Sequence, residues 1–137
     1  MILLDTQVLL WYAQADERLG REARQKVLQA TANNAACVSP ISFWEAAMLA
    51  DKDRISLDMP VEKWVQGVVG SGQIIVADLA PEIAAAAGCL PGGIHGDPAD
   101  RIIIATARAY RCPVLTTDRK ILAYAKAGHV EATDANR

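Results

Sequence analysis

The chain has 137 residues, 52% of them hydrophobic, and its 14 basic and 16 acidic residues give a formal net charge of −2. This size and composition suit one domain with its own core, and the balanced charge excludes the broadly basic surface of a nucleic-acid coat protein. We therefore expect residues 1–137 to form a single domain that binds any nucleic acid locally, with residues 131–137 as a frayed tail.

Rare residue types exclude further classes of protein. The cysteines Cys37, Cys89 and Cys112 form no CxxC pair and stand beside apolar residues, which favours buried, reduced thiols over a disulfide or a zinc site. The chain has 2 histidines, too few for a His-rich metal cage. Its apolar N-terminal stretch has no basic region and is interrupted by Asp5, so it is predicted to be neither a signal peptide nor a membrane span.

Short apolar runs alternate with helical patterns along the chain. In chain order, the patterns predict a strand at 2–4, helices at 6–13 and 21–31, a strand at 35–39, a helix from residue 40, a helix at 61–69, a strand at 73–79, a helix at 81–90, a long helix at 97–111, a strand at 113–118, a helix at 119–128 and a possible edge strand at 129–132. Apolar strands separated by helices are typical of a parallel sheet that is covered on both faces. The predicted fold is a three-layer α/β/α domain with a central parallel sheet of four to five strands.

Two acidic residues directly follow predicted buried strands. Asp5 ends the first strand and Asp118 ends the fourth. The carboxyl ends of parallel strands share one edge of the sheet, where ligands bind, so we expect the two side chains at the same place. Each aspartate taken singly is also a natural helix N-cap, because its carboxylate can accept hydrogen bonds from the first amides of a helix.

Glu45 is predicted to lie on the buried face of a helix. It shares one helical stripe with three apolar residues, Ile41, Trp44 and Met48. A buried, unpaired carboxylate is costly, so Glu45 needs a cation, a network of donors or a proton. An internal salt bridge with an arginine is the alternative to a metal ion.

The segment HGDPADR contains two aspartates with different predicted roles. Asp97 precedes Pro98, which suits the first position of a helix, so we expect Asp97 to be the N-cap. Asp100 shares a helical face with Ile103 and Ala107 and is expected near the same edge of the sheet. A capping role explains Asp97 fully, but it explains Asp100 only if that side chain turns back to the backbone.

Several carboxylates at one edge of a sheet need a counter-charge. Two carboxylates about 5 Å apart repel by roughly 3 kcal/mol at an effective dielectric constant of about 20. A divalent cation supplies the missing charge, and carboxylate ligands favour Mg²⁺ or Mn²⁺. Such an ion can activate water and neutralise a phosphate, so the residues predict metal-assisted hydrolysis of a phosphodiester. The candidate catalytic residues and metal ligands are Asp5, Glu45, Asp100 and Asp118.

A family resemblance covers nearly the whole chain and is carried by three stretches, LLDTQVLLWYA, VSPISFWEAA and DPADRIIIATARAYRCPVLTTD. In these stretches the chain resembles the PIN-domain ribonucleases, most closely the VapC-type toxins of bacterial toxin–antitoxin pairs. The resemblance implies that the family's acidic quartet falls on the four acids named above. It also implies supporting roles for Thr6 and Thr116, and Asp97 is expected to support the site as a helix cap.

The same resemblance implies a function and its partners. It implies a Mg²⁺- or Mn²⁺-dependent endoribonuclease, an RNA substrate, inhibition by a VapB-type antitoxin, a homodimer and a cytoplasmic location away from membranes. Two positions depart from the pattern: Gln7 stands where this branch often has His, and Ala99 where it often has Phe. Neither change removes an expected metal ligand, so we expect it to alter contacts with substrate or partner.

Basic residues close to the acids are candidates for RNA contacts. Arg101 follows Asp100, Arg119 follows Asp118, and His95 lies in a glycine-rich loop. Solvated charge is the alternative for the arginines, and an ordinary loop residue is the alternative for His95. Two rival functions stay open: a catalytically silent PIN-like binding protein, which would keep every acid, and a phospho-receiver module, whose acidic pair and final lysine this chain lacks.

Overall fold

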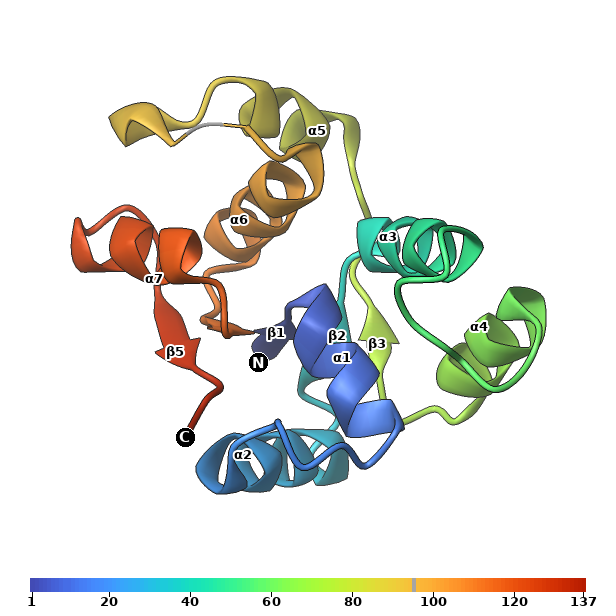
Figure 1. Cartoon of the computed structure of the whole chain (residues 1–137). Helices are drawn as coiled ribbons and strands as arrows, with labels where there is room; N and C mark the ends of the chain where they lie inside the picture. Colours follow the sequence, from blue (N-terminus) through green and yellow to red (C-terminus); the bar gives the residue numbers. More distant parts are fainter. Residues whose placement is uncertain (95) are drawn as a thin grey trace.

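The computed structural model describes residues 1–94 and 96–137, and in this part of the chain five parallel strands form one sheet (Figure 1). The strands are β1 (Ile2–Leu4), β2 (Ala36–Val38), β3 (Ile75–Val76), β4 (Val114–Thr116) and β5 (Ala132–Asp134). Their order across the sheet is β3-β2-β1-β4-β5. The predicted α/β/α fold with a parallel sheet is therefore confirmed.

Seven α-helices connect these strands within the described residues. They are α1 (Thr6–Ala13), α2 (Arg21–Ala32), α3 (Pro40–Asp51), α4 (Val61–Gly70), α5 (Pro81–Gly88), α6 (Pro98–Tyr110) and α7 (Arg119–Lys126), with a short 3₁₀ turn at Pro91–Gly93. Each α-helix lies where the sequence pattern predicts one. In the residues that the structure describes, no helix has the length and apolar character needed to cross a membrane.

Alternate residues of the central strands point to opposite faces of the sheet. Leu4 and Leu115 pack into a cluster with residues of α1, α2 and α4, while Leu3 and Val114 pack against α6. All four leucine and valine side chains are fully buried. Burying such a side chain stabilises the fold by about 1.5–3 kcal/mol, so these alternating contacts fix the strands firmly between two helical layers.

The two edge strands differ from the sequence prediction. β3 contains only Ile75 and Val76, whose side chains are 41% and 38% exposed, because this strand pairs with β2 on one side alone. β5 begins at Ala132 rather than at His129. It pairs in parallel with β4 over Val114 to Thr116.

The expectation that residues 131–137 fray is wrong. Ala135 is fully buried, and its carbonyl accepts a hydrogen bond of 2.9 Å from the Gly20 amide. The Arg137 carbonyl accepts another, of 2.7 Å, from the Glu22 amide. A Cβ atom on Gly20 would lie 1.9 Å from the Arg137 carbonyl carbon, so only glycine allows the C-terminal segment to pack this closely on the start of α2.

The three cysteines are free thiols but do not share one environment. Cys37 and Cys112 are buried, as predicted. Cys89 is exposed, contrary to prediction, because it is the C-cap of α5 and lies beyond the part of that helix that packs on α6.

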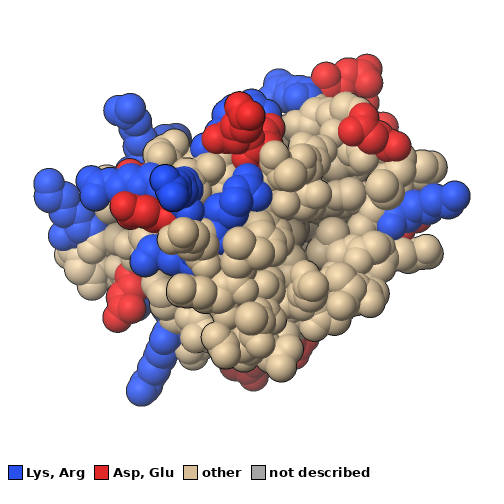
Figure 2. Space-filling model, turned by 90° about the horizontal axis from the view of Figure 1, so that it is seen from below, with Lys and Arg blue, Asp and Glu red and all other residues tan. Residues whose placement is uncertain are grey.

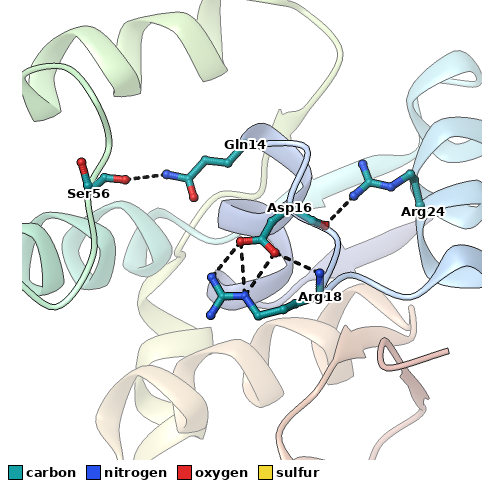
Figure 3. A network of polar contacts seen from close by, with 5 residues as sticks. All are labelled: Gln14, Asp16, Arg18, Arg24 and Ser56. Carbon is teal, nitrogen blue, oxygen red and sulfur yellow. Dashed lines mark hydrogen bonds and ion pairs between the residues drawn. The ribbon is translucent and has the colours of Figure 1, made fainter.

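Polar contacts hold the segment that follows α1 (Figure 3). The Gln14 side chain donates a hydrogen bond of 2.6 Å to the Ser56 carbonyl, which lies between α3 and α4. The Asp16 carboxylate accepts from the Arg18 guanidinium at 2.7 Å, and the Asp16 carbonyl accepts from Arg24 at 2.7 Å. These contacts fix the C-terminal end of α1, the helix whose first turn adjoins Asp5.

Figure 2 shows the molecule from below, and the charged side chains form no continuous basic surface on this face. On this face most Lys and Arg side chains gather at the left, beside Asp and Glu, and a wide area carries no charge (Figure 2). This distribution agrees with the balanced composition of the chain.

The strand order places β1 between β2 and β4 and so creates a site for ligands. The chain leaves β1 toward β2 and β3 and then returns across the sheet to β4, on the other side of β1. Open parallel sheets usually bind ligands at the carboxyl ends of their strands, in the crevice where the strand order reverses in this way. Helices α1, α3, α6 and α7 surround the end of β1 (Figure 1).

Candidate metal centre

The four predicted acids line one pocket at this edge. The pocket has a volume of about 210 Å³ and is lined by Asp5, Thr6, Gln7, Leu10, Glu45, Leu49, Asp100, Thr117 and Asp118. The structure therefore brings together carboxylates from the end of β1, from α3, from the first turn of α6 and from the start of α7. Among the described residues, three larger hollows are each lined by at most two acids: Glu131 in two of them, and Asp53 with Asp58 in the third.

Asp5 is the most firmly held carboxylate of the pocket. Its side chain is 7% exposed. One carboxylate oxygen accepts a hydrogen bond of 2.8 Å from the Thr6 amide, and the other accepts one of 2.5 Å from the Thr116 hydroxyl. The pKa of Asp5 is raised to about 6, mainly by burial and also by the charges of Glu45 and Asp118, while the hydrogen bonds from Thr116 and Thr6 oppose the rise.

Asp118 is the N-cap of α7 and also lines the pocket. Its Oδ1 atom accepts hydrogen bonds from the amides of Lys120 and Ile121, at 2.7 and 3.2 Å, and so caps α7. Its own amide donates to the Thr116 hydroxyl at 2.9 Å. Because the cap uses Oδ1, the Oδ2 atom is the one left to interact with a ligand in the pocket.

Glu45 reaches the pocket from α3, although its helix is oriented differently from the prediction. Trp44 is 53% exposed, and the buried residues of α3 are Ser42 and Ala46, so the predicted buried stripe through Trp44 is wrong. Glu45 itself is half-buried. Partial burial raises its pKa, as do the charges of nearby aspartates, whereas a hydrogen bond from the Thr6 side chain lowers it.

An internal salt bridge does not neutralise Glu45. Among residues 1–94 and 96–137, the single side-chain ion pair joins Arg18 to Asp16, at 2.7 Å, near the surface. No lysine or arginine lines the described pocket. The arginine alternative for Glu45 therefore finds no support in the described structure.

The two aspartates of the HGDPADR segment separate as predicted. The Asp97 carboxylate accepts hydrogen bonds from the amides of Ala99, at 2.8 Å, and Asp100, at 3.3 Å, which makes Asp97 the N-cap of α6. Asp100 lies one turn further on and lines the pocket. The pKa of Asp100 is raised to about 7, mainly by burial and secondly by repulsion from the charges of Asp118 and Asp5.

The donor atoms of the pocket suit a hard divalent cation. They are carboxylate, hydroxyl and amide oxygens, the ligands that Mg²⁺ and Mn²⁺ prefer. Burial and repulsion between the carboxylates raise the pKa values of Asp5 and Asp100, so a cation bound beside them would favour their charged forms. In the described residues no three His, Cys, Asp or Glu side chains are placed to hold a metal as they stand, so an ion would have to draw these carboxylates closer together.

The basic residues proposed as RNA contacts have different surroundings. Arg101 donates to the backbone carbonyls of Ala87, at 2.8 Å, and Ile94, at 2.6 Å, and so fastens α6 to the end of α5 and the following turn. It does not line the pocket. Arg119 is exposed at the start of α7. His95 lies outside the described residues.

Sequence reasoning did not place three polar residues beside the acids, although it identified one of them, Gln7, as a departure from the family pattern. Gln7 and Thr117 line the pocket, and each lies within two positions of a predicted acid, which is the signal that could have identified them. Ser42 is fully buried and hydrogen-bonded to Thr6 at 2.9 Å. Ser42 precedes Glu45 by one helical turn, a spacing that places both residues on one side of α3.

Comparison with known proteins connects this geometry to a family. A model of the PIN domain matches residues 2–127. Ribonuclease VapC22 of Mycobacterium tuberculosis is 36% identical over 120 residues, which cover 88% of each chain. The PIN-domain match includes all four acids of the pocket.

Solved structures share the fold at lower sequence identity. A toxin–antitoxin complex from Klebsiella pneumoniae aligns with a TM-score of 0.60 and 21% identity, over 90% of this chain and 91% of the other. VapBC2 from Rickettsia felis, bound to a DNA fragment from its promoter, aligns with a TM-score of 0.66 and 17% identity over 98% of both chains. With its acids, its sheet and its relatives taken together, the chain belongs to the PIN-domain family and, within it, to the VapC-type ribonucleases.

Proposed function

We propose that this protein is a metal-dependent endoribonuclease that acts as the toxin of a toxin–antitoxin pair and hydrolyses RNA phosphodiester bonds. The observation that carries the proposal is the gathering of four carboxylates in one pocket whose described lining holds no basic side chain. The 36% identity to a protein named a ribonuclease supports the reaction type. Membership of the PIN-domain family sets aside the phospho-receiver alternative.

The catalytic and metal-binding residues in this proposal are Asp5, Glu45, Asp100 and Asp118, with Thr6, Thr116 and Asp97 as supporting residues. Mg²⁺ or Mn²⁺ bound here would activate water and neutralise charge on the scissile phosphate. Each of the four acids would offer a carboxylate oxygen to the ion.

The chain's own residues determine how well these oxygens are placed. Asp5 is immobilised through both of its carboxylate oxygens, so it serves as the fixed ligand. Asp118 offers Oδ2 while Oδ1 holds α7 in place. Asp97 orients the first turn of α6 and with it Asp100. The partly apolar walls, Leu10 and Leu49, restrict water around the acids.

The partners in this proposal follow from the family. A VapB-type antitoxin would neutralise the enzyme, and the similar structure from Klebsiella pneumoniae, a toxin–antitoxin complex, supports this partner. The enzyme would act in the cytoplasm as a homodimer of single-domain chains covering residues 1–137. Arg119 and His95 are proposed to contact RNA, whereas Arg101 acts within the fold.

Incubation of the purified protein with labelled RNA tests the proposal. We expect cleavage with Mg²⁺ or Mn²⁺, none with a chelator, and none for Asp5→Asn, which keeps the size of the side chain but removes its charge. Asp16→Asn is the matched control, since Asp16 lies in the surface segment after α1. Metal and RNA binding without cleavage by the wild-type protein would favour the silent binding protein instead.

A further inference from the structure

A row of buried hydroxyl groups lies directly beside the acids. Thr116 and Ser42 are fully buried, and Thr6 is 3% exposed. The Thr116 hydroxyl contacts Asp5 Oδ2, and the Thr6 hydroxyl is hydrogen-bonded to the Ser42 hydroxyl at 2.9 Å. The Thr6 amide donates to Asp5 Oδ1 at 2.8 Å. Thr6 is therefore the link between the aspartate after β1 and the helix α3.

The Thr6 hydroxyl has two possible acceptors and a single proton. In the structure it donates to the Ser42 hydroxyl, and Glu45, whose pKa hydrogen bonding from the Thr6 side chain would lower, lines the same pocket as Thr6. A hydroxyl donates one hydrogen bond and accepts up to two. When Thr6 donates to the Glu45 carboxylate, only the Ser42 hydroxyl can donate to Thr6 in turn. Ser42 can thus reverse the direction of this hydrogen bond and leave the Thr6 proton for Glu45.

We propose that Ser42 is a positioning residue, whose hydroxyl holds Thr6 in the rotamer that directs the Thr6 hydroxyl to the Glu45 carboxylate, in the pocket where Glu45 would share a metal ion with Asp5. This inference rests on the metal-dependent function proposed above. Ser42 touches neither substrate nor metal. It acts through Thr6, across the contact between α1 and α3 and over a separation of 36 residues in sequence.

The packing around Ser42 explains why this position carries a hydroxyl. Ser42 and Ala46 are the buried residues of α3, and their small side chains let α3 lie close to α1. An alanine would fit at position 42 just as well as at position 46. The hydroxyl therefore adds a hydrogen bond where packing alone requires only a small residue.

Binding of Mn²⁺ to the RNA-free protein, measured by electron paramagnetic resonance, tests the inference with Ser42→Ala. We expect about fivefold weaker binding, the size of effect that one net hydrogen bond gives. Thr106→Val is the matched control, because Thr106 is another buried helical hydroxyl and donates only to the Ile102 carbonyl, at 2.7 Å. We expect this control to bind Mn²⁺ as the wild type does.

A double-mutant cycle separates positioning through Thr6 from a general structural role. In a Thr6→Val background, Ser42→Ala should cause no further loss of Mn²⁺ affinity. The NMR couplings of the metal-free protein should report one Thr6 rotamer in the wild type and averaging between rotamers in Ser42→Ala. Thermal unfolding checks that each variant folds.

The possible outcomes distinguish a failure of the role proposed for Ser42 from a failure of the proposed nuclease function. Unchanged Mn²⁺ affinity in Ser42→Ala, a loss of the same size in the Thr6→Val background, or an unchanged Thr6 rotamer would overturn the role of Ser42 and leave the nuclease proposal standing. A wild-type protein that binds Mn²⁺ with the expected Ser42 dependence but cuts no RNA would overturn the nuclease proposal alone. A wild-type protein that binds no Mn²⁺ would overturn both.

Discussion

The Thr116 hydroxyl donates a hydrogen bond of 2.5 Å to Asp5 Oδ2, joining two residues that are 111 positions apart in sequence. The same hydroxyl oxygen accepts a hydrogen bond of 2.9 Å from the Asp118 amide. The buried Thr116 side chain at the end of β4 thus fixes the carboxylate of Asp5, which follows β1, and the backbone of Asp118, which follows β4. Thr116 therefore positions two acids of the pocket through its hydrogen bonds.

Replacing Thr116 with valine should shift the pH dependence of cleavage upward. The Thr116 hydrogen bond is the main influence that holds the raised pKa of Asp5 down to about 6, so its loss should raise that pKa further. A hydrogen bond to a charged group contributes about 1.5 kcal/mol or more, which corresponds to about one pH unit, so activity should fall about twofold at neutral pH and about tenfold at about pH 5. A pH–rate profile measures the shift. Thr116→Ser should keep the wild-type profile, and a valine variant with that same profile would contradict the assigned role.

Metal-free protein should be more stable in mild acid than in mild alkali. Folding raises the pKa of Asp5 from 3.8 to about 6 and that of Asp100 from 3.8 to about 7. The folded state therefore binds protons that the unfolded state releases, and stability is lost as the pH rises through these folded-state values. Calorimetry in a chelating buffer at about pH 5 and about pH 8 measures the difference.

Adding Mg²⁺ should reverse this pH trend, because the ion binds the deprotonated carboxylates and stabilises only the folded state. The metal should raise the unfolding temperature more at about pH 8 than at about pH 5. Equal unfolding temperatures at both pH values, with and without Mg²⁺, would show that the acids do not interact in the folded protein.

Asp97→Asn and Asp100→Asn should have opposite consequences although the two residues are one turn apart. Asparagine caps helices nearly as well as aspartate, so Asp97→Asn should retain most of the activity. Asp100→Asn removes a charge from the pocket and should lower cleavage by more than about a hundredfold, since even indirect partners of metal ligands cost up to that much. RNA cleavage assays on both variants provide the comparison. Equal losses would mean that Asp97 does more than cap α6.

Deletion of residues 132–137 should destabilise the whole domain. It removes β5 and three backbone hydrogen bonds made by Ala135 and Arg137. At about 1 kcal/mol each, these bonds amount to about 3 kcal/mol before the loss of buried apolar area. Chemical denaturation measures the change. Asn136→Ala, at an exposed position within the same segment, is the control and should alter stability by less than about 0.5 kcal/mol.

The fold was predictable because the central strands and helices have clear apolar patterns. β1, β2 and β4 are buried almost throughout, so all their residues except Thr116 are apolar. β5 has no such pattern, since its residues Ala132 to Asp134 are only partly buried. Backbone pairing with β4 and the close approach of Gly20 decide its position, and neither can be read from hydrophobicity.

The acids of the site were predictable for a related reason. Asp5 and Asp118 directly follow strands, and parallel strands end at one edge, so their meeting follows from the fold class alone. The orientation of α3 was not predictable in the same way. Its buried side is made by Ser42 and Ala46, which pack closely because they are small, and the larger Trp44 lies outside. A search for large apolar residues therefore assigns the wrong side of this helix to the core.

The central position of β1 has a consequence for the time at which a nuclease of this design becomes active. Asp5 leaves the ribosome 111 positions before Thr116, whose hydroxyl holds it, and the last acid of the pocket, Asp118, follows only after that. A nascent chain that stops short of β4 carries three of the acids without the strand that aligns them. The proposed toxin would thus acquire its cutting site only after β4 and the start of α7 have been synthesised.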